Sequence, residues 1–120
     1  MAEVINDRKL ERKYAVGNGP GPVLLTVIIG DAQIGGSAVF IDNKLIAKGQ
    51  ILHVPVGAPA DLVGHLLGIN TVVADVNEQT NKSSVTYILT GGGGEAEYTL
   101  QFEAQKDKQQ VLYSAIFAMV

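Results

Sequence analysis

The sequence predicts an all-β protein: an antiparallel β-sandwich, immunoglobulin-like or jelly-roll-like, with seven or eight strands and one short helix. Three observations lead to this fold class. Short runs rich in β-branched residues recur along the chain, turn residues separate these runs, and one segment alternates strictly between apolar and polar side chains. Of the 120 residues 47% are apolar, which is enough to bury the core of a single domain.

The strictest alternation lies in residues 95–104, EAEYTLQFEA. Tyr98, Leu100, Phe102 and the two alanines fall on one face, whereas the glutamates, the threonine and the glutamine fall on the other. A period of two residues is typical of a strand with one buried face and one solvated face. This segment therefore predicts a strand that covers one side of a core.

The remaining strands are predicted where short apolar runs lie between turn residues. The run VLLTVII is apolar on both faces and is rich in β-branched residues, which favours a central strand. Residues 42–45, DNKL, are typical of a tight hairpin turn. The predicted strands lie in residues 23–30, 32–41, 45–54, 69–76, 83–90 and 111–120, and the alternation in residues 10–16 permits a short edge strand.

The one helical candidate lies in residues 55–68, PVGAPADLVGHLLG. Asp61 can cap its first turn, and Leu62, Leu66 and Leu67 lie within one apolar stripe. Gly68 can end the helix and Gly64 lies inside it, so we expect a short helix of about two turns.

Two glycine-rich segments organise the chain into parts. Residues 1–21 are predicted to form a polar N-terminal arm with a Gly/Pro hinge, and residues 22–120 are predicted to form the β-sandwich domain. The hinge is GNGPGP at 17–22, where glycine permits positive φ and proline removes a backbone donor. The four glycines at 91–94 are predicted to form a flexible hairpin tip.

The charge and the absence of cysteine limit the classes of partner. The net charge is −3 and only 18% of residues are charged, so no basic footprint for nucleic acid is present. The absence of cysteine excludes disulfides and thiolate metal sites. No segment has the roughly 18 apolar residues of a membrane helix, and the N-terminus lacks an apolar signal region. We expect no membrane span and a cytoplasmic location by default, with leaderless export or loss of a leader as alternatives.

The last strand, residues 111–120, is apolar on both faces. Val111, Tyr113, Phe117 and Met119 lie on one face, and the other carries a leucine, an isoleucine, an alanine and a valine. One face can be covered by an opposite sheet, but a small chain with almost no helix has no third layer for the other. We therefore predict a homo-oligomer in which Val111, Tyr113, Phe117 and Met119 form the interface.

Two groups of residues are candidate metal ligands. His53, Asp61 and His65 would suit zinc if the strand end at residue 53 folds back onto the helical candidate. Asp75 and Asn77 are weaker candidates for a calcium ion.

The loop that contains this weaker pair is DVNEQTNKSS, residues 75–84. It lacks the central glycine and the final glutamate of an EF-hand, so we interpret it as a turn held by side-chain caps. No cofactor is expected.

A metal-dependent enzyme that uses His53, Asp61 and His65 is the one catalytic alternative that the sequence offers. The serine in GGSAV lacks the following glycine of a nucleophile elbow, and the four-glycine segment precedes an acidic strand instead of a helix. The first functional hypothesis is a non-catalytic structural or protein-interaction module that associates with itself. The alternative is a small-ligand or carbohydrate-binding module that uses loops at one end of the sandwich. Tyr14 is the one tyrosine not assigned to the core, and tryptophan is absent.

Overall fold

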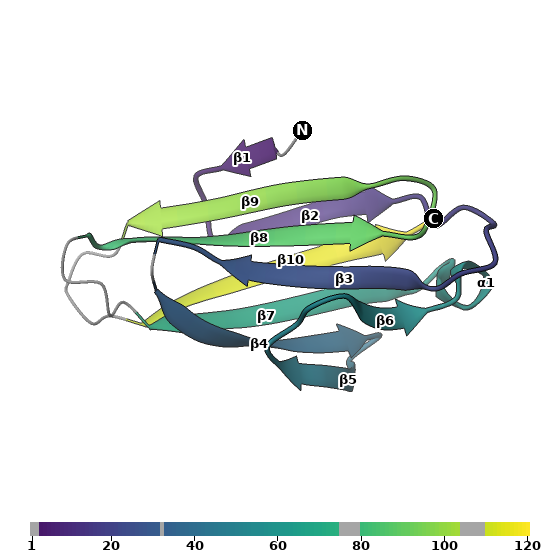
Figure 1. The fold of residues 1–120 in the computed structure, drawn as a ribbon, viewed down its shortest axis with the longest axis horizontal. Helices are drawn as coiled ribbons and strands as arrows, with labels where there is room; N and C mark the ends of the chain where they lie inside the picture. Colours follow the sequence, from purple (N-terminus) through teal and green to yellow (C-terminus); the bar gives the residue numbers. More distant parts are fainter. Residues whose placement is uncertain (1–2, 32, 75–79, 104–109) are drawn as a thin grey trace.

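The computed structural model describes residues 3–31, 33–74, 80–103 and 110–120. In these residues the chain forms ten strands and one helix of four residues, arranged as two five-stranded sheets. Figure 1 shows their strands running side by side along the long axis of the molecule. The predicted all-β sandwich architecture is confirmed.

The first sheet, sheet A, contains strands from both halves of the chain. Its order is β1 (Glu3–Ile5), β9 (Ala96–Glu103), β8 (Lys82–Thr90), β3 (Val23–Ile29) and β6 (Val54–Gly57). β8 and β9 form a hairpin whose tip is the four-glycine segment, and β8 also pairs with β3 in antiparallel orientation.

The second sheet, sheet B, contains the C-terminal strand near its centre. Its order is β2 (Lys9–Tyr14), β10 (Gln110–Met119), β7 (Leu66–Ala74), β4 (Ile34–Ile41) and β5 (Lys44–Gly49). β10 pairs with β7 along nine residues and β7 pairs with β4 along eight, all in antiparallel orientation. The residues between β4 and β5 form the predicted turn, where Asp42 and Asn43 have positive φ.

The strand number and the orientation differ from the prediction of seven or eight antiparallel strands. The two strands beyond eight are β1, a second strand of the arm, and β6, which arises because the predicted strand at 45–54 is divided; β2 is the edge strand that residues 10–16 permit. Both strands of the arm are parallel to their neighbours: β1 to β9, and β2 to β10. The count of ten described strands exceeds the seven of an immunoglobulin constant domain and the eight of a jelly roll. Sequence patterns indicate strands but not their partners, so the parallel pairs could not be inferred from the arm.

The arm is anchored by apolar side chains set among charged ones. Leu10, Tyr14 and Val16 are buried in the core, although the residues between them are exposed. At the edge of the sandwich, the Arg12 guanidinium donates to Glu3 at 2.5 Å and lies 5.8 Å from the centre of the Tyr98 ring. These contacts tie β2 of sheet B to β1 and β9 of sheet A.

The helix is shorter than predicted. α1 spans Pro59–Leu62, and its N-cap is Ala58 with no side-chain hydrogen bond, so Asp61 does not cap it. Gly64 has φ of +85° and follows the last turn, which ends the helix before the leucine pair. Leu66 and Leu67 instead begin β7, where they point to opposite faces of sheet B. Periodicity alone did not separate a short helix from a strand here.

The predicted strand at 45–54 is divided between the two sheets. β5 ends at Gly49, where φ is +102°, and the chain then crosses to β6 of sheet A. Part of this crossing is fixed by backbone contacts: the Val27 N–H donates to the Ile51 carbonyl at 2.8 Å. His53 has φ of +49°, and its N–H donates to the Thr26 hydroxyl at 3.0 Å.

The core lies between the two sheets and follows the strict alternation of the strands. β8 and β10 each alternate between buried and less buried residues along most of their length. Tyr113 is buried, and its hydroxyl donates to the Ser83 carbonyl at 3.0 Å. The largest buried side chains are Tyr87, Tyr113, Phe117, Leu25, Ile51 and Leu67.

The four-glycine segment is packed against the N-terminal arm. The Gly93 N–H donates to the Ala15 carbonyl at 2.9 Å, and the Tyr14 hydroxyl donates to the Gly94 carbonyl at 2.6 Å. Burial raises the pKa of Tyr14 above its ordinary value. Tyr14 is therefore a structural contact of this tip and not the free aromatic residue that the sequence suggested.

Within the part of the chain that the structure describes, a membrane-crossing helix is ruled out, because α1 has only four residues.

Candidate interaction surface

The C-terminal strand β10 presents its two apolar faces to different environments. Val111, Tyr113, Phe117 and Met119 are at most 1% exposed, because sheet A of the same chain covers them. The Phe117 ring packs 5.8 Å from that of Tyr98. These four residues need no second chain to cover them, and we do not assign them to an interface. The sequence pattern identified two apolar faces but could not tell which one pointed inward.

The opposite face of β10 remains uncovered and continues onto β7. Leu112 is 62% exposed and Ile116 is 37% exposed on β10, while Leu66 is 51% exposed and Val72 is 37% exposed on β7. Leu112 lies directly opposite Val72 in the register of the two strands. We call the outward side of sheet B the apolar face.

The outward side of sheet A has a different composition. Thr86 of β8 and Thr99 of β9 lie opposite each other there, and their hydroxyls are 2.8 Å apart. Glu97 and Gln101 lie on the same side of β9. A sheet with a solvated outer side normally carries polar residues at these positions. Sheet A follows this rule in part, because Ile28 and Val4 are also exposed on its outward side. On sheet B the exposed apolar side chains lie together on the two neighbouring strands β7 and β10.

Two shallow depressions flank the centre of the apolar face. One has a volume of about 290 Å³ and lies between β4, β7 and β10, where Gly68 has no side chain. The other has a volume of about 670 Å³ and lies between β2, β7 and β10. Leu66 and Ile116 line both depressions, so these two side chains form a ridge between them.

The ridge has opposite charges on its two sides. Asp42, in the turn after β4, accepts a hydrogen bond from the Leu66 N–H at 2.9 Å, and its other carboxylate oxygen is hydrogen-bonded to His65 Nδ1. These two contacts lower the pKa of Asp42, so it is an anion at neutral pH. On the other side, exposed Lys13 of β2 lines the larger depression together with Glu11.

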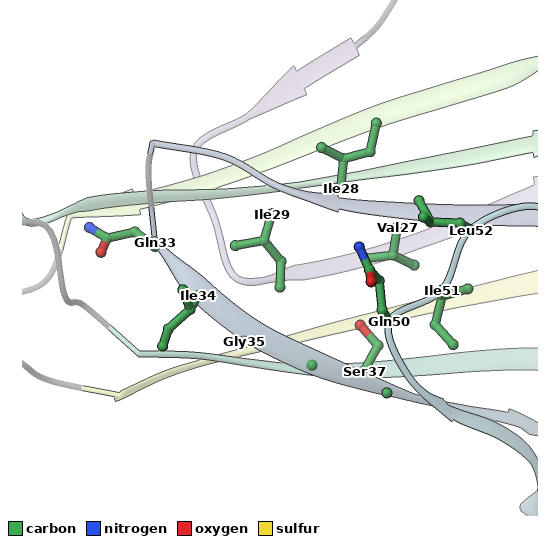
Figure 2. Close-up of a pocket in the computed structure, with 12 residues that line it drawn as sticks. Val27, Ile28, Ile29, Gln33, Ile34, Gly35, Ser37, Gln50, Ile51 and Leu52 are labelled. Atoms are coloured by element: carbon green, nitrogen blue, oxygen red, sulfur yellow. The ribbon is translucent and has the colours of Figure 1, made fainter.

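A separate groove opens where both sheets lose an edge strand. β6 pairs with β3 only at Val23–Leu25, and β5 pairs with β4 only at Ser37–Ile41. The space between the remaining parts of β3 and β4 has a volume of about 350 Å³. Figure 2 shows Ile29 between the two strands and Gln50, on the crossing segment, beside the opening.

Among the residues that the structure describes, those that line this groove include no charged and no aromatic side chain. Ile28, Ile34 and Leu52 contribute exposed apolar surface, and Gln33, Ser37 and Gln50 contribute polar groups. Sugars are usually bound on aromatic faces, so this lining suits an apolar ligand better than a carbohydrate.

The three predicted zinc ligands do not form one group in the structure. His53 contacts Thr26, His65 contacts Asp42, and Asp61 lies exposed on α1. Because the helix ends at residue 62, Asp61 and His65 do not share a helical face. Among residues 3–31, 33–74, 80–103 and 110–120, no three acidic or histidine side chains form a group that could hold a metal ion. Asp75 and Asn77 lie outside the described residues.

Sequence reasoning missed Leu66 and Val72 as surface residues. Leu66 was assigned to a helical stripe, and Val72 lies in a run with valine at two successive positions, which hides the direction of each side chain. The available signal was the second apolar face of the C-terminal strand, which carries Leu112 and Ile116 and needed a cover as much as the first.

Comparison with protein-family models, curated proteins and solved structures found no significant match. The fold and the surface together define a β-sandwich protein that exposes apolar side chains on the outward side of sheet B.

Proposed function

We propose that this protein is a non-catalytic β-sandwich module that associates with itself through the apolar face of sheet B. The observation that supports the proposal is the set of exposed, register-matched apolar side chains on β7 and β10, with Leu112, Ile116, Leu66 and Val72 at its centre. The outer side of sheet A stays in solvent in such an assembly.

The expected energy and area are those of a stable dimer. Burying an exposed leucine, isoleucine or valine contributes about 1.5–3 kcal/mol. The 39 residues of the five strands, each covering about 4.8 Å by 3.4 Å, give roughly 640 Å². This area is at the lower end of what one partner of a standard interface contributes. The four central residues and this area favour a contact of two complete sheets over a small encounter surface.

Replacing Ile116 by glutamate is expected to dissociate the assembly. The change places a carboxylate at the ridge of the apolar face, where it loses water on association without a matching cation. Light scattering coupled to size exclusion, at micromolar concentration, is expected to give an oligomer mass for the natural chain and a monomer mass for Ile116→Glu.

The matched control is Ile28→Glu, which introduces the same charge at an exposed isoleucine on the outer side of sheet A. This variant is expected to keep the oligomer mass. A natural chain that is monomeric at micromolar concentration, or an Ile28→Glu variant that dissociates as completely as Ile116→Glu, contradicts the assignment of the interface to sheet B.

The groove between β3 and β4 supports a second candidate function, binding of a small apolar ligand. Its uncharged lining and its exposed isoleucines favour such a ligand. We expect the fluorescent probe 1-anilinonaphthalene-8-sulfonate to bind there, and we expect Gln50→Trp to remove this binding by filling the opening.

The variant Ile116→Glu separates the groove from the apolar face, because it changes only the face. Titration of probe fluorescence is expected to show groove binding in Ile116→Glu and its loss in the double variant with Gln50→Trp. Equal probe binding in the two variants contradicts the groove as a ligand site.

A further inference from the structure

The apolar face carries a knob and a hole on neighbouring strands. Ile116 of β10 is exposed and lies opposite Gly68 of β7 in their register. Phe40 of β4 lies on the other side of Gly68, so the glycine forms a recess between larger side chains. Because an isologous contact uses the same patch on both copies, a match requires Ile116 of one copy to meet Gly68 of the other.

Only one direction of the two-fold axis places Ile116 of each copy over Gly68 of the other. Two identical sheet faces that pack against each other are related by an axis lying in the plane between them. An axis perpendicular to the strands places β10 on β10 and β7 on β7, so the knob never meets the hole. An axis parallel to the strands, midway between β10 and β7, places β10 of each copy on β7 of the other at the same level (Figure 1 shows the strands involved).

The same axis also brings together residues at other positions along β7 and β10. Leu112 meets Val72, Ser114 meets Asn70, and Ala118 meets Leu66, according to the cross-strand register. These contacts pair apolar with apolar, hydroxyl with amide, and a small side chain with a large one. They leave no central side chain facing an unsuitable partner.

One pair of charges at the rim is also matched, whereas Glu11 of each copy faces Phe40 of the other. β2 and β4 lie at equal distances on either side of this axis, so each packs on the other in the partner copy. Lys13 lies opposite Ala118 in the register of β2 and β10. Asp42 lies beside Leu66, because its carboxylate accepts a hydrogen bond from the Leu66 N–H. Since Ala118 and Leu66 lie opposite each other, Lys13 of each copy faces Asp42 of the other. Two ion pairs therefore form, one at each side of the ridge.

We infer that two copies of this chain pack through sheet B about a two-fold axis parallel to β7 and β10, with Ile116 of each copy seated over Gly68 of the other. The inference rests on the proposed function and adds the partner's orientation to it. It specifies a closed dimer, because an isologous contact uses up the face in both copies.

Cross-linking with single cysteines tests the axis, because the natural chain has no cysteine. Lys9 of β2 and Ala38 of β4 are on the level of Ser114 and Asn70, so they face each other between copies. Packed sheets are about 10 Å apart, which exceeds the Cα separation of a disulfide, so a short bis-maleimide is used. Lys9→Cys and Ala38→Cys are prepared separately and then mixed in equal amounts.

Cross-linked dimer is expected predominantly in the mixture. In each separate batch the two identical cysteines lie about three strand spacings apart sideways, roughly 14 Å, in addition to the gap between sheets. Serine replacements at the same two positions are the controls, and light scattering of these is expected to give the natural mass. If either position proves essential for association, Glu11→Cys with Phe40→Cys gives the same test one level along the axis.

The contrary outcomes separate the inference from the function on which it rests. Efficient linking of Lys9→Cys to itself, with an oligomer mass retained, overturns the axis and leaves self-association through sheet B standing. A monomer mass for the natural chain, with no linking in any sample, overturns both.

Discussion

Replacing Phe117 by alanine is expected to lower the free energy of unfolding by about 3–5 kcal/mol. Phe117 is fully buried, and its ring packs against the rings of Tyr87 and Tyr98 at centre distances of 6.5 and 5.8 Å. The substitution removes most of a large aromatic side chain from between the sheets and leaves a cavity that β strands cannot close. Urea denaturation, followed at several protein concentrations, measures the loss.

The concentration series distinguishes a core residue from an interface residue. The loss in Phe117→Ala is expected to be the same at every concentration, because the ring is covered within one chain. Leu112→Ala on the same strand is the matched control, since Leu112 is 62% exposed and points the other way. For a dissociated chain, this control is expected to change stability by less than about 0.5 kcal/mol. A small, concentration-dependent loss for Phe117→Ala would place the ring between chains instead.

Replacing Gly91 by alanine is expected to lower the free energy of unfolding by about 2–4 kcal/mol. Gly91 has φ of +83°, a conformation that favours glycine, and an added Cβ would lie 2.4 Å from the Pro22 carbonyl oxygen. The neighbouring atom belongs to the backbone, so the hairpin tip and the segment before β3 must separate. Thermal unfolding monitored by circular dichroism measures the effect.

Gly19 provides the control for this substitution. It lies in the other glycine-rich segment, has no positive φ, and would place a Cβ with no atom within 4 Å. Gly19→Ala is expected to keep or slightly raise the melting temperature, because alanine restricts the unfolded chain. Equal melting temperatures for the two variants contradict the packed description of the four-glycine tip.

The contrast between these two glycines shows where sequence reasoning reached its limit. Both segments contain several glycines within six residues and appear as flexible connections. Only the fold places Tyr14 and Ala15 against residues 92–94, which turns one connection into a packed corner. Contacts between positions nearly 80 residues apart leave no local signal in the sequence.

The sequence showed that both sides of β10 are apolar but not which one is buried. The structure places Phe117 and its neighbours in the core and leaves Leu112 and Ile116 exposed. When a strand shifts by one residue along its partner, every side chain moves to the opposite face of the sheet. When both faces are apolar, the pattern contains no information about which is inside.

The sequence by itself determined the all-β class, most strand positions and the excess of apolar surface, because these follow from side-chain alternation and turn chemistry along the chain. Only the tertiary structure decided the parallel pairing of the arm, the crossing between β5 and β6, the early end of α1 and the outward direction of Leu112 and Ile116. These features depend on which segments meet in space. Local propensity fixes the elements, whereas burial between two sheets selects their partners and their inward faces.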